Sequence, residues 1–128
     1  MAAARRVVVI PGQSISHLIP MLEFAATCLG RGLAVTVVIP DPTLNAPAFR
    51  STICRYVSRL PSLSVHSLPL PSADPHTVDA AAHPLIRIQA ATRSQAPALR
   101  DFLRSLPAVH ALVADMLDVV YAVDVAAE

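Results

Sequence analysis

Residues 6–39, RVVVIPGQSISHLIPMLEFAATCLGRGLAVTVVI, predict a β-α-β unit that decides the fold. The β-branched run Arg6–Ile10 stops at Pro11-Gly12, as expected of a strand that is covered on both faces of a parallel sheet. Apolar residues then recur at helical spacing between positions 18 and 29. A second buried-type strand follows at Leu33–Ile39, so the first two strands are joined by a helix and should lie parallel.

Both ends of this first helix carry recognisable signals. Ser16 is the expected N-cap, and Pro20 falls in the first turn, where its missing N–H costs little. The Gly30-Arg31-Gly32 segment supplies the C-terminal stop.

The same alternation of strands and helices continues along the chain. We expect a helix over 49–60, a strand at Leu63–Leu68, a loop at Pro69–His76, a helix through Leu85 and Leu106 kinked at Pro97, a strand at His110–Ala114 and the start of a helix at Val119–Glu128. The fold class is therefore α/β, a Rossmann-like, doubly wound parallel sheet with strand order 3-2-1-4.

Composition narrows the class of function. The chain has 54% hydrophobic residues and a formal charge of +1, with arginines and carboxylates mixed along it, so neither a nucleic-acid nor a membrane-surface partner is expected. No stretch is long and apolar enough for a membrane span or a signal peptide, which predicts a cytoplasmic protein. Cys28 and Cys54 form no metal-binding spacing with the histidines and are read as reduced apolar thiols.

Two polar residues follow strands that the topology makes neighbours. His17 comes just after the first strand and Asp115 just after the fourth, at the edge of the sheet where such folds bind ligands. A carboxylate on one nitrogen of an imidazole leaves the other nitrogen free to accept a proton, as in general-base catalysis. In the alternative, His17 only starts a helix and Asp115 caps the last one, a role for which Asp118 also competes.

The turn after the first strand carries no phosphate-binding pattern. Residues 11–16 read PGQSIS and contain neither G-x-G-x-x-G nor G-K-[ST]. A dehydrogenase or a P-loop nucleotidase is therefore not expected.

Four segments carry a further signal: SHLIPMLEFA at 16–25, GLAVTVV at 32–38, LRDFLRSL at 99–106 and ALVADM at 111–116. Together they resemble the corresponding segments of plant family 1 UDP-glycosyltransferases. The resemblance implies that His17 is the general base, that Asp115 balances its charge, and that Ser16, Met116 and Asp118 line the acceptor site. It also implies a UDP-sugar as co-substrate, with no metal and no other cofactor. Ser16 replaces the usual glycine of the family and Asp118 an apolar or small residue, and either change is expected to narrow or damage the site.

The resemblance also sets the expected domain organisation. Residues 1–128 correspond to a partial N-terminal, acceptor-binding domain of a GT-B fold, and the tryptophan-containing UDP-sugar signature of the C-terminal donor domain is absent. The implied function is inverting transfer of a sugar, glucose, to a hydroxyl of a small phenolic acceptor such as a flavonoid, and this chain alone is expected to be inactive. The alternative is a truncated, non-catalytic fragment, or a module that binds a small molecule or a partner protein.

Overall fold

The computed structural model describes residues 5–12, 14–40, 46–68, 95–115 and 125–127. Its elements, in chain order, are β1 (Arg6–Ile10), α1 (Ile15–Gly30), β2 (Ala34–Pro40), α2 (Pro47–Arg59), β3 (Ser64–Leu68), α4 (Ala96–Ser105) and β4 (Ala111–Ala114). All three strand pairs are parallel, and the strand order is β3-β2-β1-β4. The predicted α/β class and the order 3-2-1-4 are confirmed.

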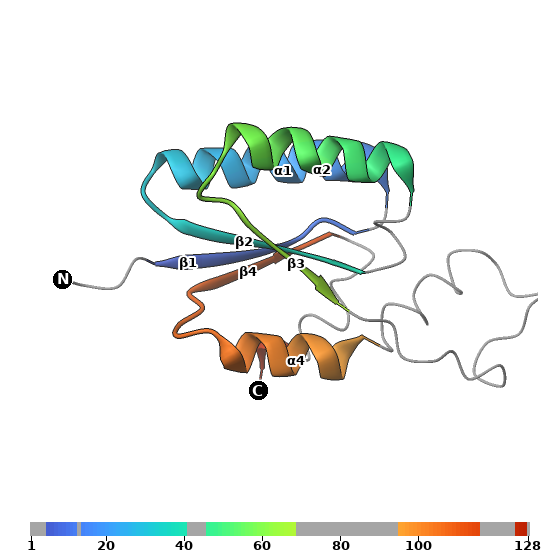
Figure 1. Ribbon diagram of the computed structural model, residues 1–128. Coiled ribbons are helices and arrows are strands. Elements are labelled where there is room, and N and C mark those ends of the chain that lie inside the picture. Colours follow the sequence, from blue (N-terminus) through green and yellow to red (C-terminus); the bar gives the residue numbers. More distant parts are fainter. Residues whose placement is uncertain (1–4, 13, 41–45, 69–94, 116–124, 128) are drawn as a thin grey trace, which may run out of the picture.

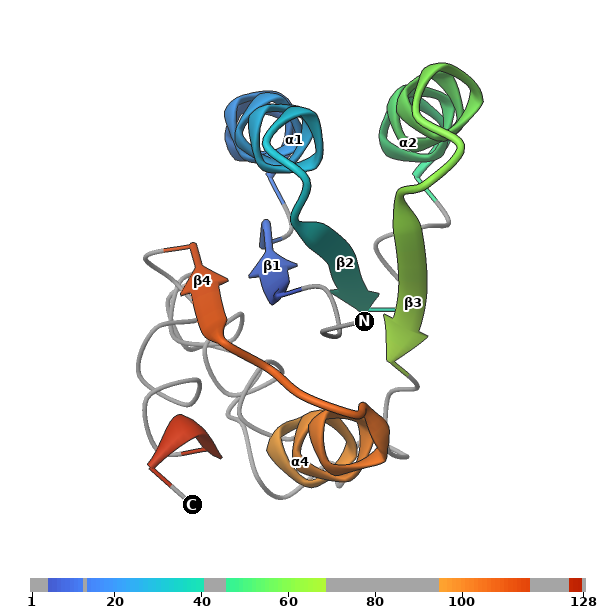
Figure 2. The ribbon, with the colours of Figure 1, turned by 90° about the vertical axis from the view of Figure 1, so that its left-hand side faces the viewer.

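Helices cover both faces of the sheet. Figure 1 shows α1 and α2 on one face and α4 on the other, and the end-on view of Figure 2 shows the three layers. Side chains of β1 alternate between the layers: Val7 and Val9 pack into the core under α1 and α2, whereas Val8 and Ile10 pack toward α4. This two-sided burial explains why β1 is apolar at every position from 7 to 10.

The helix α1 begins earlier than the sequence predicts. Its N-cap is Ser14, in an extended conformation, and the Ser14 carbonyl accepts the first helical hydrogen bond from the Leu18 N–H at 3.0 Å. The Ser14 hydroxyl makes no capping bond, because its Oγ lies 2.8 Å from the Oγ of Ser16. The prediction of Ser16 as the N-cap is therefore wrong, since Ser16 already belongs to the first turn.

The helix α4 also starts differently from the prediction. Pro97 stands in its first turn, after the N-cap Gln95, so this proline begins the helix rather than kinking it. The first part of the predicted long helix, the predicted loop Pro69–His76 and most of the predicted helix Val119–Glu128 lie outside the described residues.

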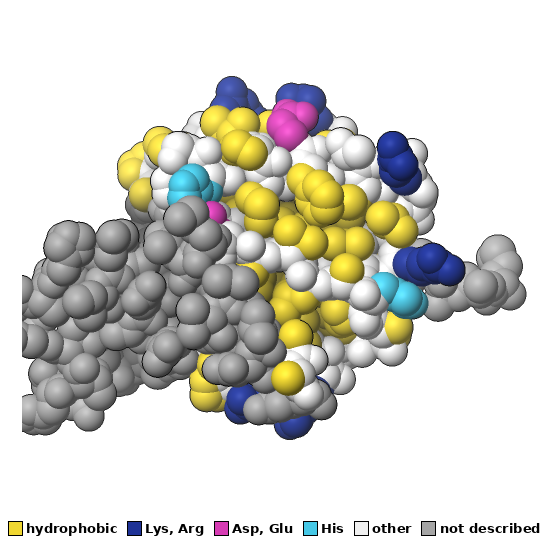
Figure 3. Space-filling model, turned by 180° about the vertical axis from the view of Figure 1, so that it is seen from behind, with side chains coloured by type: hydrophobic (Ala, Val, Ile, Leu, Met, Phe, Trp, Pro, Cys, Tyr) yellow, Lys and Arg dark blue, Asp and Glu magenta, His cyan; other side chains and the backbone are white. Residues whose placement is uncertain are grey.

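The strand β4 forms one edge of the described sheet. In the part of the chain that the structure describes, β4 pairs with β1 and has no partner on its other side. Figure 3 views this side and shows hydrophobic side chains gathered on it. Leu112, Val113 and Ala114 are partly exposed there, in keeping with a sequence suited to a central strand. No helix among the described residues is both long and apolar enough to cross a membrane.

Candidate active site

The pairing of β4 with β1 places Asp115. Ile10 pairs with Ala114, and the N–H of the next residue, Asp115, donates to the Ile10 carbonyl at 2.8 Å. Side chains alternate along β4: Leu112 and Ala114 pack toward α4, whereas Val113 packs against the core under α1. Asp115 is two residues beyond Val113 and therefore points to the same face, so its carboxyl group lies on the α1 side of the sheet.

The first turn of α1 brings His17 to the same place. His17 is the third residue of the helix, and its Nδ1 lies 2.7 Å from the Oδ1 of Asp115. The two atoms are close enough for an ion pair, although Nδ1 is not aligned for a regular hydrogen bond. The predicted juxtaposition of His17 and Asp115 is therefore observed, and we call the two residues the dyad.

The two members of the dyad differ in exposure. The Asp115 side chain is 8% exposed and that of His17 is 38% exposed, while Nδ1 itself is buried. The exposed part of the His17 side chain therefore excludes Nδ1. A buried carboxylate at Nδ1 favours the tautomer with a proton on Nδ1, and in this tautomer Nε2 carries the lone pair that can accept a proton.

Sequence reasoning missed one residue of the site, Gly12. It is buried, has a φ of +79°, and its backbone passes against the side chain of Asp115. A glycine two residues after a strand is a sign of close backbone approach, and this signal was present in the Pro11-Gly12 dipeptide.

The other predicted site residues are only partly described. Ser16 is exposed in the first turn of α1, beside His17 in sequence, and its hydroxyl pairs with Ser14. Met116 and Asp118 lie outside the described residues, so their acceptor-binding roles stay predictions. Within the described ranges, no group of three His, Cys, Asp or Glu side chains is arranged to hold a metal ion.

The cysteines fit their predicted role only in part. Both are free thiols in the structure. Cys28 is buried in the core under α1, as a small apolar side chain would be, but Cys54 is exposed on α2.

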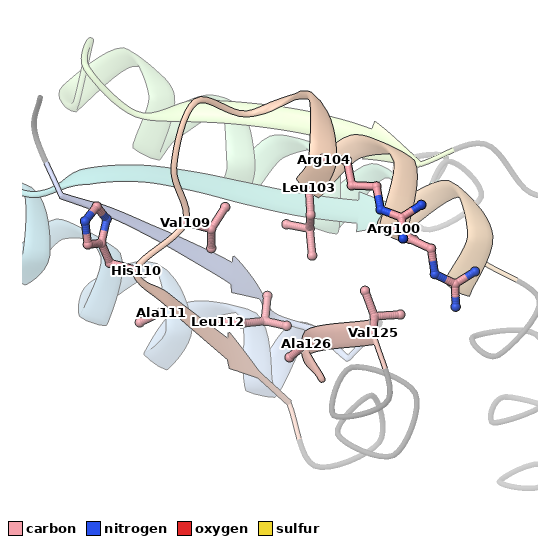
Figure 4. Close-up of a pocket in the computed structure, with 9 residues that line it drawn as sticks. All are labelled: Arg100, Leu103, Arg104, Val109, His110, Ala111, Leu112, Val125 and Ala126. Carbon is pink, nitrogen blue, oxygen red and sulfur yellow. The ribbon is translucent and has the colours of Figure 1, made fainter. Parts of the chain in front are cut away.

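A separate cavity of about 360 Å³ lies between α4 and β4 (Figure 4). It is lined by Arg100, Leu103, Arg104, Val109, His110, Ala111, Leu112, Val125 and Ala126. None of these residues belongs to the dyad. Among the described residues that line the cavity there is one imidazole and no carboxylate to orient it, so for proton transfer we favour the dyad over this cavity.

Comparison with known proteins identifies relatives of the chain. It is 37% identical to UDP-glycosyltransferase 72B3 of Arabidopsis thaliana over 126 residues, which are 95% of this chain and 25% of that protein. The solved structure of LpCGTa in complex with UDP matches 97% of this chain and 30% of its own, with a TM-score of 0.81 at 23% identity. No protein-family model matches the chain.

A second solved structure has a higher identity. It is a UDP-glucosyltransferase from Polygonum tinctorium capable of glucosylating indoxyl, in complex with 3,4-dichloroaniline. It is 29% identical, with a TM-score of 0.73, over 98% of this chain and 28% of its own.

The sheet order and these structural matches define the fold as a Rossmann-like domain of the GT-B type. Over nearly its whole length the chain is similar to plant UDP-glycosyltransferases, as a fragment of a family 1 enzyme would be. It spans about a quarter of the length of the Arabidopsis relative.

Proposed function

We propose that this segment forms the acceptor-binding half-site of an inverting UDP-sugar glycosyltransferase, with His17 as general base and Asp115 as its orienting carboxylate. The observation that carries the proposal is the 2.7 Å contact between His17 Nδ1 and Asp115 Oδ1 at the carboxyl ends of β1 and β4. Open parallel sheets bind their ligands outside this edge, at the point where the strand order reverses. The similarity of the chain to a plant UDP-glycosyltransferase supports the same chemistry.

The proposed reaction transfers one proton and breaks one bond. Nε2 of His17 takes the proton of the acceptor hydroxyl, and the acceptor oxygen attacks the anomeric carbon of the sugar. The bond from that carbon to the UDP oxygen breaks, and UDP leaves with the electron pair. The imidazolium that forms is stabilised by the Asp115 carboxylate, which is buried and therefore poorly screened by water.

We propose glucose as the sugar and a small phenolic, such as a flavonoid, as the acceptor. Support for the sugar comes from the Polygonum relative, which is described as a UDP-glucosyltransferase. Support for an aromatic acceptor comes from the same relative, which glucosylates indoxyl. Ser16, Met116 and Asp118 are the residues of this chain that we propose to contact the acceptor.

The test uses a chimeric protein in which residues 1–128 replace the matching quarter of the Arabidopsis relative, so that the whole remainder of that protein, including a donor-binding half, follows them. UDP release and product formation are measured with UDP-glucose and a panel of phenols. We expect a product of inverted anomeric configuration, read from the coupling of the anomeric proton. His17→Ala should lower kcat by about 10²- to 10⁴-fold, the usual contribution of a positioned general base.

His110→Ala is the matched control. It removes an exposed imidazole that precedes β4, at the opposite end of the strand from Asp115. The Nδ1 of His110 accepts a 3.2 Å hydrogen bond from the Arg6 N–H, but this bond is exposed, so water can replace it and turnover should stay within about twofold of the parent. Wild-type turnover in the His17→Ala protein would overturn the assignment of the base. A folded protein that makes no product with any phenol would overturn the function and favour the non-catalytic alternative.

A further inference from the structure

Gly12 and Asp115 are packed more tightly than any side chain at position 12 would allow. A Cβ atom built on Gly12 would lie 2.9 Å from Oδ2 of Asp115 and 3.1 Å from its Cβ and Cγ. Non-bonded carbon atoms prefer separations of about 3.5 to 4.0 Å, so all three contacts would be repulsive. The absence of a side chain at position 12 is what lets the loop pass beside the carboxyl group.

The Asp115 side chain has little freedom to move away from such a contact. Its backbone is tied to β1 by the hydrogen bond to the Ile10 carbonyl, and its Oδ1 is against His17. The side chain is only 8% exposed, so it is surrounded by protein atoms and cannot swing out into solvent. A displacement of Oδ2 therefore rotates the carboxyl group and moves Oδ1 relative to Nδ1 of His17.

We propose that Gly12 is a positioning residue for glycosyl transfer, because its bare backbone forms the surface that holds the Asp115 carboxyl group toward His17. Gly12 contacts neither sugar nor acceptor in this role and acts only through Asp115. The proposal rests on the proposed function for its catalytic consequence. Its structural content, that residue 12 sets the geometry of the dyad, is independent of that function.

The chain contains a matched control for the backbone. Gly32, in the turn between α1 and β2, has a φ of +83°, close to the +79° of Gly12. A Cβ on Gly32 would meet nothing within 4 Å. Gly12→Ala and Gly32→Ala therefore share the strain of a left-handed alanine, and only Gly12→Ala adds the contact with Asp115.

The kinetic test compares both variants in the protein with a donor-binding half, using two acceptors. One is a weakly acidic alcohol, which needs a base, and the other is a nitrophenol that is already ionised at the assay pH. For the alcohol, Gly12→Ala should lower kcat by about 10- to 100-fold, as expected when a catalytic group is displaced by less than about 1 Å, with KM changed by less than about twofold. For the nitrophenol, and for Gly32→Ala with either acceptor, losses should stay below about threefold.

Equal losses on the two acceptors, or equal losses in the two variants, would overturn the proposal. The role of Gly12 can also be tested without measuring catalysis. The measurement is the ring ¹⁵N chemical shifts of His17 in protein labelled at histidine. We expect one dominant Nδ1–H tautomer in the parent and in Gly32→Ala, and a mixture in Gly12→Ala. If the parent is inactive with every acceptor, the proposed function fails, and the His17 spectra still decide the role of Gly12.

A second variant covers the case in which Gly12→Ala does not fold. Asp115→Gly removes the three atoms that would lie nearest to the new Cβ. In the Asp115→Gly background, Gly12→Ala should lower the melting temperature no more than Gly32→Ala does. A larger loss in that background would show that the clash is not with Asp115, and would overturn the proposal.

Discussion

Replacing Asp115 by asparagine tests the electrostatic part of the dyad. Asparagine keeps the shape of the side chain and leaves an amide group beside Nδ1 of His17, but it carries no charge. The variant should therefore keep the packing against Gly12 and lose the stabilisation of the imidazolium that forms in the transition state.

The magnitude follows from the contact distance and the exposure. With Nδ1 and Oδ1 2.7 Å apart, the charge centres are roughly 4 Å apart, and at an effective dielectric constant of about 20 the attraction is about 4 kcal/mol. The ring of His17 is 38% exposed, so water reduces this value, and about 2 to 4 kcal/mol is the expected range. At about 1.36 kcal/mol for each tenfold change in rate, kcat should fall by about 30- to 1,000-fold.

The assay is the rate of UDP release at saturating UDP-glucose with a weakly acidic acceptor, in the protein that includes a donor-binding half. Asp101→Asn, which neutralises an exposed carboxylate on α4, is the control and should change kcat by less than about twofold. A folded Asp115→Asn protein with a kcat within about threefold of the parent would refute the reasoning, because the charge would then contribute less than about 1 kcal/mol.

Three further predictions concern folding and association, and the first two are measured in the protein that includes a donor-binding half. The Tyr56 hydroxyl donates to Glu23 Oε1 at 2.5 Å and this bond raises the pKa of Tyr56, so Tyr56→Phe should cost about 1 kcal/mol in denaturant unfolding. Because folding raises the pKa of Tyr56, the difference in unfolding free energy between the parent and Tyr56→Phe should be present below about pH 10 and disappear at higher pH, as Tyr56 ionises. A difference that persists at high pH would contradict the assigned role of this hydrogen bond. Leu22→Ala, at a fully buried site, should cost about 2 to 5 kcal/mol, whereas Phe24→Ala, 42% exposed on the same helix, should cost less than about 1 kcal/mol. Residues 1–128 expressed alone should aggregate or bind apolar dyes through the β4 edge, and a monodisperse monomer with a sharp thermal transition in size-exclusion and melting experiments would disprove it.

The strands could be predicted from the sequence because two-sided burial leaves a continuous apolar signal. Arg6–Ile10 was predicted with the boundaries that the structure gives, and β3 and β4 each differ from prediction by one residue. The strand order was predicted because alternating strands and helices favour a doubly wound parallel sheet, whose common order is 3-2-1-4.

The helix starts could not be predicted as well, because the signals were ambiguous. Ser14 and Ser16 are both suitable N-caps by residue type, and only the backbone conformation at Ser14 selects the earlier one. Pro97 fits either a kink within a long helix or the first turn of a short one, and the structure shows the second.

The site was predictable in part for a similar reason. The meeting of His17 and Asp115 follows from topology, because the carboxyl ends of neighbouring parallel strands share one edge of the sheet. The role of Gly12 does not follow from topology, since it depends on a through-space contact between two loops. No pattern in the sequence predicts how closely the backbone at position 12 approaches residue 115.

The register between β1 and β4 is what makes the dyad possible. Side chains alternate along a strand, so a slip of one residue would turn Asp115 toward α4, on the opposite face of the sheet from His17. Two backbone hydrogen bonds fix the register at the two ends of β4, from the His110 N–H to the Arg6 carbonyl at 2.9 Å and from the Asp115 N–H to the Ile10 carbonyl at 2.8 Å. The proposed catalytic geometry is therefore set by main-chain pairing, and Gly12 can refine it only because that pairing has already brought Asp115 to the α1 side.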